Sequence, residues 1–346
     1  MIMKRNSGTS GAYCSEPTHE ADSNFRQPHC TNFFATISLR VSAQKFTLTF
    51  FISLVCTLVT SAQQDPLHSQ YIFNPLIINP AYAGFTKDIT GIAAYRIQWA
   101  GFDGSPVTMN ASGHIALADN RMGLGLTLLH DDLGTNKTTE VLVSYGYHID
   151  VGKNSRISFG LQGGAVNYRN DFSELIIDSN DPKFQSRISE FSPTFGAGII
   201  YSSDKIFASI AVPKMLDGKT TTENNIDIVL YGQQFYAMGA YLFTLSHRLK
   251  LKPFIMTRIT TGVPMSTDFG IVLNADDSYT LGLFTRNLHT YGAMMKINLG
   301  DMLRVGYIFE LPTNKSIGFN YTAHEITIGI RTRLLRFHDV SSISDF

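Results

Sequence analysis

The sequence predicts an all-β fold, a transmembrane outer-membrane β-barrel of about fourteen antiparallel strands. Three observations predict it. Apolar residues recur at every second position, tight turns alternate with longer polar connections, and only 16% of the 346 residues are charged, against roughly 25% in soluble domains. Aromatic residues reach 12%. Few charges and many aromatic side chains are typical of a β protein whose outer surface meets lipid.

The strands are predicted from period-two alternation, which places alternate residues on opposite faces. Near the end of the chain Ile326, Ile328 and Ile330 alternate with polar residues and glycine. Fourteen segments fit this pattern, centred near residues 94, 112, 126, 143, 161, 197, 208, 239, 254, 271, 282, 294, 306 and 330. Gly123, Gly125 and the glycines at 160, 163 and 164 fall inside these segments, where we expect close packing rather than phosphate binding.

The connections support closure into a barrel. Short segments rich in Asn, Asp, Gly and Ser suit hairpin turns, and they lie at residues 118–120, 150–154, 202–204, 274–277 and 299–301. Longer polar connections lie at 169–190, 213–229 and 311–322. An even strand number allows antiparallel pairing throughout, and closure leaves no strand edge exposed to hydrocarbon. A secreted β-sandwich is the soluble alternative, because it also has one apolar face on each strand.

The alternation also predicts which polar side chains face the lumen. If the face of Val107 and Ile115 meets lipid, His114 points inward. By the same reasoning Arg331 and Arg333 point inward when Ile326 and its neighbours point outward. An arginine on the lipid face near the midplane would cost about 2–4 kcal/mol, which favours this assignment.

The first 62 residues are expected to be absent from the mature chain. Residues 39–62 contain a basic flank, an apolar run over 46–59 and a small-residue ending at Ala62, the pattern of a secretory signal peptide. The polar leader over residues 1–38 suggests a start assigned too far upstream. All three cysteines precede the expected cleavage point, so a disulfide framework is not predicted. The remaining chain divides into a strap at 63–88, a barrel at 89–337 and a tail at 338–346.

No motif predicts catalysis. The chain lacks a phosphate-binding loop and a nucleophile elbow, so we expect no enzyme, no cofactor and no metal site. We interpret His130-Asp131-Asp132 as a solvated turn after a strand, and His324-Glu325 as structural. A formal net charge of zero argues against a nucleic-acid partner.

Residues 71–84 carry two Asn-Pro steps around an apolar run. Each proline fixes φ and removes a backbone donor, and each preceding Asn is pushed towards extended geometry. We therefore expect a stiff, non-helical segment. Two roles remain open at this point: the segment plugs or lines the periplasmic side of the barrel, or it docks a partner.

This segment resembles the mature N-terminus of the PorP/SprF family of type IX secretion system outer-membrane proteins. The block from Arg96 to Thr108 is similar to the family's Arg-x-Gln-Trp…Gly-x-Pro-x-Thr pattern, and residues 124–134, 190–200 and 322–326 resemble further family strands. The signature and partner-docking candidates are Asn74, Pro75, Asn79, Pro80, Tyr82, Gly84, Arg96, Gln98 and Trp99. Ile97 and the polar tail after Phe337 depart from the family pattern.

The resemblance implies a location and a function. It places the chain in the outer membrane of a Gram-negative bacterium, in contact with outer-membrane lipid. It implies an accessory role in secreting or anchoring adhesin-like cargo, with other type IX components as partners and a link to gliding motility. Loops 169–190 and 213–229 are the candidate cargo contacts. The alternative is an outer-membrane diffusion channel or transporter, with His114, Arg331 and Arg333 setting its selectivity.

Overall fold

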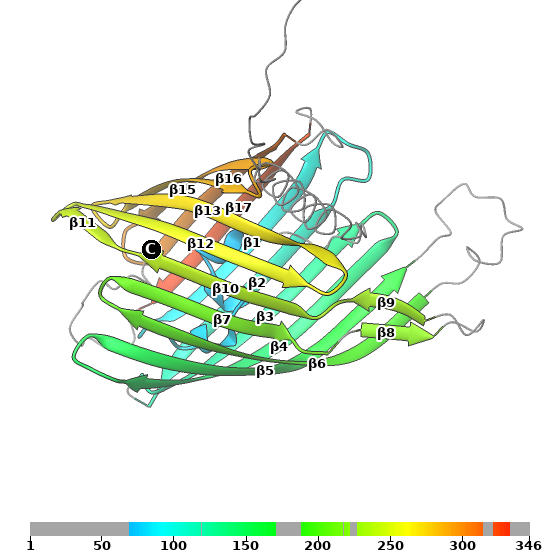
Figure 1. Ribbon diagram of the computed structural model, residues 1–346, viewed down its shortest axis with the longest axis horizontal. Helices are drawn as coiled ribbons and strands as arrows, with labels where there is room; N and C mark the ends of the chain where they lie inside the picture. The colour runs from blue at the N-terminus through cyan, green and yellow to red at the C-terminus, as the bar shows by residue number, and fades with distance from the viewer. Residues whose placement is uncertain are drawn as a thin grey trace, which may run out of the picture. The chain divides into compact units, whose positions relative to one another are not determined.

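The computed structural model describes residues 69–118, 120–170, 188–216, 218–221, 227–313 and 321–332. Fourteen strands of this part close into an antiparallel barrel (Figure 1). They are β1 (Ile89–Ala100), β2 (Val107–Leu117), β3 (Met122–Leu133), β4 (Asn136–Asp150), β5 (Ser155–Asn170), β6 (Ile188–Ser203), β7 (Ile206–Lys214), β10 (Gln234–Tyr241), β12 (Leu249–Thr260), β13 (Val263–Ala275), β14 (Tyr279–Arg286), β15 (Thr290–Leu299), β16 (Leu303–Pro312) and β17 (Thr322–Thr332).

Closure results from pairing between the first and last strands. β1 pairs with β17, so Arg96 lies opposite Glu325 and Tyr95 opposite Ile326. The short β11 (Phe243–Ser246) follows β10 after Leu242 and pairs with β12. A separate hairpin forms from β8 (Gly218–Thr221) and β9 (Asp227–Tyr231). The wall is therefore a continuous cylinder with one hairpin beyond it.

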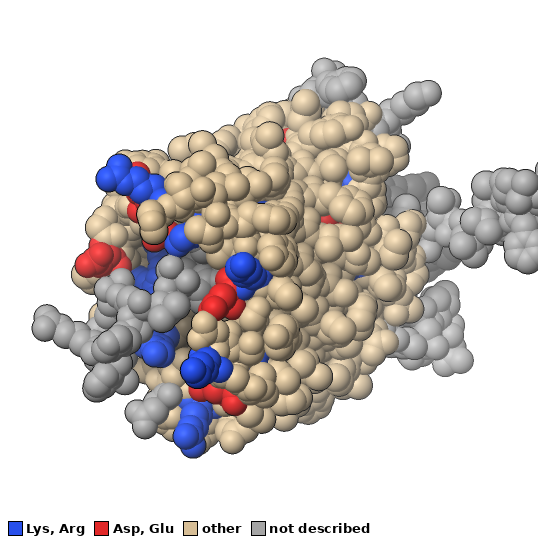
Figure 2. Space-filling model, turned by 60° about the vertical axis from the view of Figure 1, so that its left-hand side comes forward, with Lys and Arg blue, Asp and Glu red and all other residues tan. Residues whose placement is uncertain are grey.

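The two rims differ. Turns of two to four residues, such as 151–154 and 204–205, join strands at one end, which we call the turn-side rim. The opposite end, the loop-side rim, has short turns as well, but it also carries the β8–β9 hairpin and the connections at 101–106, 171–187 and 313–321. Figure 2 shows Lys, Arg, Asp and Glu gathered at the turn-side rim, beside a wide band of uncharged residues.

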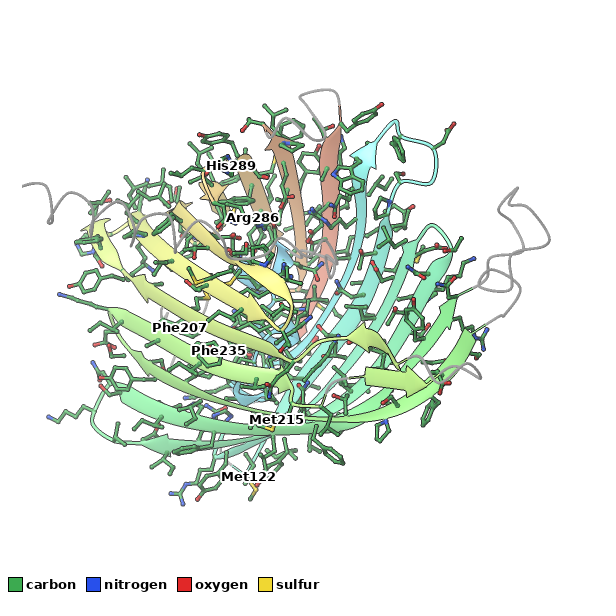
Figure 3. All side chains as sticks on the ribbon, turned by 45° about the vertical axis from the view of Figure 1, so that its right-hand side comes forward. Met122, Phe207, Met215, Phe235, Arg286 and His289 are labelled. Atoms are coloured by element: carbon green, nitrogen blue, oxygen red, sulfur yellow. The ribbon has the colours of Figure 1, made fainter. Side chains whose placement is uncertain are left out.

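The outer face of that band is apolar. Leu161, Leu283 and Ile330 are 64%, 63% and 57% exposed, whereas the residue before each of them, on the other face of the strand, is buried. Side chains project from both faces of the wall, and Arg286 lies at the loop-side end of β14 beside His289 (Figure 3). No helix in the described ranges is long and apolar enough to cross a membrane. This outward apolar surface has the character of a lipid-facing band.

The predicted strand set is confirmed, with local corrections. His130-Asp131-Asp132 is not a turn but part of β3, because the strand continues to Leu133 and Asp131 is buried, accepting a 2.6 Å hydrogen bond from the Thr108 hydroxyl. The expected loop at 213–229 is also wrong in part, since it contains the β8–β9 hairpin. The connection at 171–187 lies outside the described residues.

The strap is not the non-helical segment expected. It forms three single turns of 3₁₀ helix at Gln70–Ile72, Pro75–Ile77 and Pro80–Tyr82. The reason is the position of the prolines: a fixed φ near −65° suits the first residue of a helical turn, where the missing N–H would have no partner. Asn79 before Pro80 is extended, as expected (φ −142°, ψ 113°).

Candidate functional site: a lumen occupied by the N-terminal strap

The described part of the strap, residues 69–88, lies inside the barrel. The blue segment within the cylinder of Figure 1 is this chain. Tyr71, Ala81 and Ala83 are fully buried, and Leu76 and Asn79 are 1% exposed. The strap buries these side chains against the inner wall, so it supplies much of the apolar core of the barrel.

One wall receives the strap through a row of glycines. Gly123, Gly146, Gly160 and Gly198 come from the four successive strands β3, β4, β5 and β6. Their registers place each directly opposite the next, so they form a continuous line across the inner wall. We call these four residues the glycine row. Without side chains, the row is a shallow track along the lumen.

The strap backbone fills this track. A Cβ on Gly146 would lie within 3.0 Å of the Ala83 carbonyl oxygen, and one on Gly160 within 3.0 Å of the backbone of Pro80 and Ala81. A Cβ on Gly123 would meet the backbone of Ala83 and Gly84 equally closely. Real Cβ atoms do not approach backbone so closely, so these three positions must be glycine while the strap is seated. A Cβ on Gly198 would instead meet the Asn79 side chain. The expected close packing at these glycines is contact with the strap rather than with barrel side chains.

Gly84 is constrained in two ways. Its φ of +69° lies in the left-handed region that L side chains rarely adopt. A Cβ there would also fall within 3.0 Å of the Gly123 Cα. The strap therefore leaves the glycine row at a residue that only glycine satisfies.

Asn79 fixes the strap at the far end of the row. Its Nδ2 donates to the Ser209 hydroxyl at 2.8 Å and to the Ile199 carbonyl at 3.2 Å. Its Oδ1 accepts from the Ala81 N–H at 2.8 Å, which caps the 3₁₀ turn beginning at Pro80. One side chain thus shapes the strap and bonds it to the wall.

The opposite wall receives the strap through charged groups. We call Arg96, Asp268, Arg286, Glu310 and Glu325 the lumen charge cluster; they come from β1, β13, β14, β16 and β17. All five are at most 5% exposed. They lie towards the loop-side ends of their strands, where the strap begins.

Ion pairs connect this cluster. Arg96 contacts Glu310 at 2.6 Å and Glu325 at 3.4 Å. Arg286 donates to both Asp268 oxygens at 2.9 and 3.0 Å, and its third nitrogen lies 3.5 Å from Glu310. Burying an unpaired charge is costly, and these pairs offset that cost.

The first residues of the strap complete the network. The Ser69 hydroxyl donates to Glu310 and accepts from Arg286 at 2.7 Å. The Tyr71 hydroxyl donates to Asp268 at 2.8 Å. Burial and the adjacent Asp268 carboxylate raise the pKa of the Tyr71 hydroxyl well above its usual range, so it remains a donor. Without the strap, both carboxylates would lose a hydrogen-bond donor.

The family-signature residues of the strap all lie in this lumen. Asn74 donates to the Ser112 hydroxyl at 2.6 Å. Pro75 and Pro80 begin two of the 3₁₀ turns. Tyr82 stacks on Phe85 with ring centroids 5.1 Å apart.

The signature residues of β1 divide into two groups. Arg96 joins the charge cluster, whereas Gln98 and Trp99 lie near the loop-side end of the strand. The Gln98 N–H donates to the Pro106 carbonyl at 2.9 Å, and Trp99 has a positive φ of 58° at a register shift between Ile97 and Ala100. These two residues shape the rim and do not belong to the cluster.

The residues predicted to line the lumen can also be placed. His114 is 6% exposed, and its ring meets Tyr82 edge-on at 5.5 Å. Arg331 pairs with Asp88 at the base of the strap. Arg333 lies outside the described residues.

Three members of the cluster were not singled out from the sequence: Asp268, Arg286 and Glu310. The sequence did contain a signal for them. Each is a charged residue inside or at the end of a strand whose alternate positions are apolar. Intramembrane charges of this kind mark functional or paired sites. Their partners could not be inferred, since the Arg96–Glu310 pair spans 214 positions.

Residues 60–330 match the protein family described as type IX secretion system membrane protein PorP/SprF. The chain belongs to this family. The family, the closed barrel and the lipid-facing band together identify the chain as an outer-membrane protein with a role in type IX secretion. No curated protein matches the chain.

The chain is also similar to solved outer-membrane proteins. The chain is similar to a Pseudomonas aeruginosa FadL homologue, with a TM-score of 0.47 and 11% identity over 80% of this chain and 96% of that one. Acinetobacter baumannii Omp33 gives a TM-score of 0.42 and 7% identity over 71% of this chain and 97% of that one. A TodX mutant described as a monoaromatic hydrocarbon channel gives a TM-score of 0.46 and 8% identity over 77% of this chain and 95% of that one.

The chemistry of the site is binding and positioning. Among the described residues, no group of three or more His, Cys, Asp or Glu side chains is arranged to hold a metal ion. The charged groups are engaged with each other and with the strap. The arrangement holds one segment of chain firmly inside a membrane barrel.

Proposed function

We propose that this PorP/SprF protein is a plugged barrel that supports type IX secretion by holding partner proteins at its rim, and that it does not conduct solutes. The observation that carries the proposal is the seating of the strap. Shape complementarity on β3–β6, and hydrogen bonds of Ser69 and Tyr71 with the charged side chains of β13, β14 and β16, hold it in the lumen. A diffusion channel needs an open path, and this segment occupies it.

The loop-side rim is the proposed binding face for secreted, adhesin-like cargo or for other secretion components. β4, β5 and β6 are the longest strands, at 15 or 16 residues, and β7 has only 9. The wall is therefore uneven at this rim, and the β8–β9 hairpin extends there beyond the short strands (Figure 1). Long extracellular connections are the usual contact sites of such barrels. A raised edge beside an extended hairpin offers both backbone and side-chain contacts.

The test is replacement of residues 216–231 by a short Gly-Ser turn in the producing bacterium. We expect the barrel to assemble normally while its cargo is lost from the cell surface. The matched control inserts the same Gly-Ser residues at Gly262, a tight turn on the same rim. Unchanged surface display in the hairpin variant, together with loss in the control, would contradict the proposed face.

Single-channel recording separates this function from the transporter alternative. The purified wild-type barrel should show little conductance in a planar bilayer. Deleting residues 69–84 should produce resolved open steps, because it removes the segment between the two walls. Large, steady conductance in the wild type would reject the plugged barrel and favour a channel.

A further inference from the structure

We propose that the loop-side half of β6 is a strand-addition site, where an extended segment of secreted cargo pairs with the edge of the sheet. The site comprises residues 188–194, and we call it the β6 edge. This inference rests on the proposed function, because it names the part of the loop-side rim that makes the contact and the form that the cargo takes there.

β6 is paired with β5 along its whole length but with β7 only in part. The pairing with β5 covers Ile188–Ser203, whereas the pairing with β7 covers Ala197–Ser202. Beyond it, one further bond joins the Met215 N–H to the Phe195 carbonyl at 2.8 Å. In the part of the chain that the structure describes, no strand pairs with the β6 edge on this side, and β6 continues beyond the end of β7 (Figure 1). The edge is therefore open.

Pro213 explains why β7 separates from β6. It has no N–H, and its carbonyl accepts a 2.7 Å hydrogen bond from the Gln162 side chain of β5. Regular pairing would place Lys214 opposite Phe195, but the bond comes from Met215, one residue later. An extra residue of this kind is a β-bulge, which bends the strand that carries it. The chain then continues into β8, which pairs with β9 and not with β6.

The alternation of a strand identifies the backbone groups on the open side. Because the Phe195 carbonyl points towards β7, the backbone groups of Ser189, Phe191 and Pro193 point the same way. Pro193 supplies only its carbonyl. Its missing N–H costs the β5 ladder nothing, which is the usual position of a proline in an edge strand. Ser189 and Phe191 each offer both an N–H and a carbonyl to an added strand.

An extended peptide is the ligand that matches this edge. Its N–H and carbonyl groups recur at every second residue, as those of β6 do, so it satisfies groups that lipid cannot. Phe191 and Phe195 are 73% and 57% exposed on the outward face. Aromatic residues favour aromatic or β-branched neighbours across a strand pair. We therefore expect a cargo segment with apolar residues at alternate positions.

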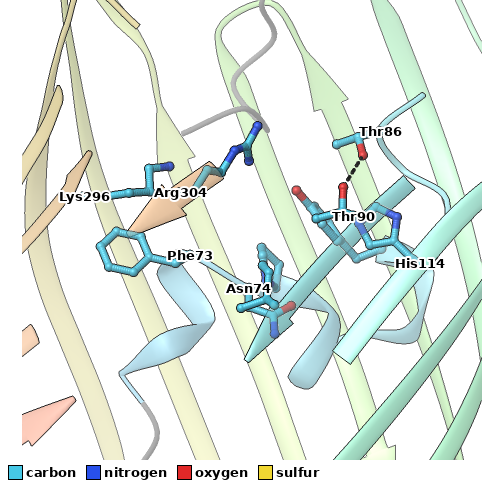
Figure 4. A pocket seen from close by; sticks show the side chains of 10 residues that line it. Phe73, Asn74, Thr86, Thr90, His114, Lys296 and Arg304 are labelled. Atoms are coloured by element: carbon cyan, nitrogen blue, oxygen red, sulfur yellow. Dashed lines mark hydrogen bonds between the residues drawn. The ribbon is translucent and has the colours of Figure 1, made fainter. Parts of the chain in front are cut away.

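The lumen offers such a segment no room. The strap occupies it, and the cavity left between the strap and the side chains of Lys296 and Arg304 has a volume of about 20 Å³ (Figure 4). That volume holds about one or two water molecules. While the strap is seated, a cargo segment has to bind outside this cavity, and the β6 edge is accessible there.

Amide hydrogen exchange, followed by NMR on the purified barrel in detergent, tests whether the edge is open. The N–H groups of Ser189 and Phe191 should exchange at least about 100-fold faster than those of Ser192 and Thr194, which point towards β5. Equal protection of all four amides would overturn the proposal, because it would show that the edge is already paired within the barrel.

Proline substitution in the producing bacterium tests whether cargo uses the edge. Phe191→Pro removes an N–H on the open side and keeps the ladder with β5, so surface display of cargo should fall at least about fivefold, the ratio expected for one lost hydrogen bond. Phe191→Ala is the matched control, because it keeps the N–H, and it should retain most of the display. If Phe191→Pro does not assemble, Ser189→Pro near the start of β6 removes the other open N–H and should give the same loss.

Each outcome decides a separate point. Unchanged display in the proline variants overturns the β6 edge, and equal loss in Phe191→Ala and Phe191→Pro overturns strand addition, because it assigns the contact to the aromatic side chain. Cargo that is lost on replacement of residues 216–231 but retained in the proline variants would reject the edge and leave the rim proposal standing. Cargo lost only in the proline variants would support the edge and reject the hairpin contact.

Discussion

Two opposite walls of the barrel hold the same strap by different physics. The β3–β6 wall holds residues 79–84 by shape, with a glycine row against which the strap backbone lies. The wall of β13, β14 and β16 holds residues 69–71 by charge, through Asp268, Arg286 and Glu310. The glycine row fixes the position of residues 79–84. Hydrogen bonds to the charged side chains fix the position of Ser69 and Tyr71 at the other end of the strap.

Glycines of the second wall have different neighbours. A Cβ on Gly270 would meet the Phe254 ring and the Phe284 Cβ, and one on Gly292 would meet the Phe284 ring. These aromatic side chains come from the adjacent strands and lie over the glycines. At Gly270 and Gly292 the second wall fills its own gaps, whereas the glycine row leaves a gap that the strap fills. Glycine therefore has two roles in this barrel: it makes room for the strap on one wall and for aromatic side chains of neighbouring strands on the other.

The largest effect should come from the charged wall. Arg286→Met leaves Asp268 without its main partner and removes the second cation beside Glu310, and removing one member of a buried pair costs about 3–5 kcal/mol. Urea unfolding in lipid vesicles would measure the loss. Arg156→Met is the control, because Arg156 pairs with Asp150, whose side chain is 66% exposed, and such surface pairs contribute about 0–1 kcal/mol. Equal losses in the two variants would contradict the distinct role of the cluster.

Phe284→Ala tests whether the second wall fills itself. The ring covers Gly292, so truncation should cost about 3–5 kcal/mol of unfolding free energy and leave the strap in place. Protease protection of the strap reports its position. Leu283→Ala on the same strand faces outward and should cost less. Strap release in Phe284→Ala would show that the two walls are not independent.

Gly160→Ala tests the first wall. The added methyl collides with the backbone of Pro80 and Ala81, and overpacking of this kind costs about 1–3 kcal/mol. Here the strap should become accessible to protease and the bilayer conductance should rise. Gly163→Ala is a matched control on the same strand, since its Cβ would lie 3.6 Å from the Phe195 ring, an ordinary contact. A seated strap in Gly160→Ala would refute the glycine row as its track.

The smallest effect is expected at Asn79. Asn79→Ala removes the cap on Ala81 and the bond to Ser209, with an expected loss of about 1–2 kcal/mol. Hydrogen exchange of the strap amides should increase locally without loss of the barrel. Asn154→Ala, in an exposed turn-side bond to Asp204, should leave exchange unchanged. Global unfolding of the Asn79 variant would show that the strap is required for assembly.

Period-two alternation determined the wall from sequence alone. A strand side chain must point to one face or the other, so Ile326, Ile328 and Ile330 identify an outward face without any partner. The same rule located all fourteen strands. It failed at His130-Asp131-Asp132, because polar residues that resemble a turn are stable in a strand when Asp131 faces inward and finds Thr108.

The tertiary structure alone decided what fills the lumen. Arg96 and Glu310 lie 214 positions apart, and the glycine row exists only once the registers of four strands align. The prolines of the strap set its local turns, but its site in the barrel depends on those distant surfaces. Alternation is a local property that each segment carries by itself, whereas complementarity between the strap and the wall is a property of the closed barrel.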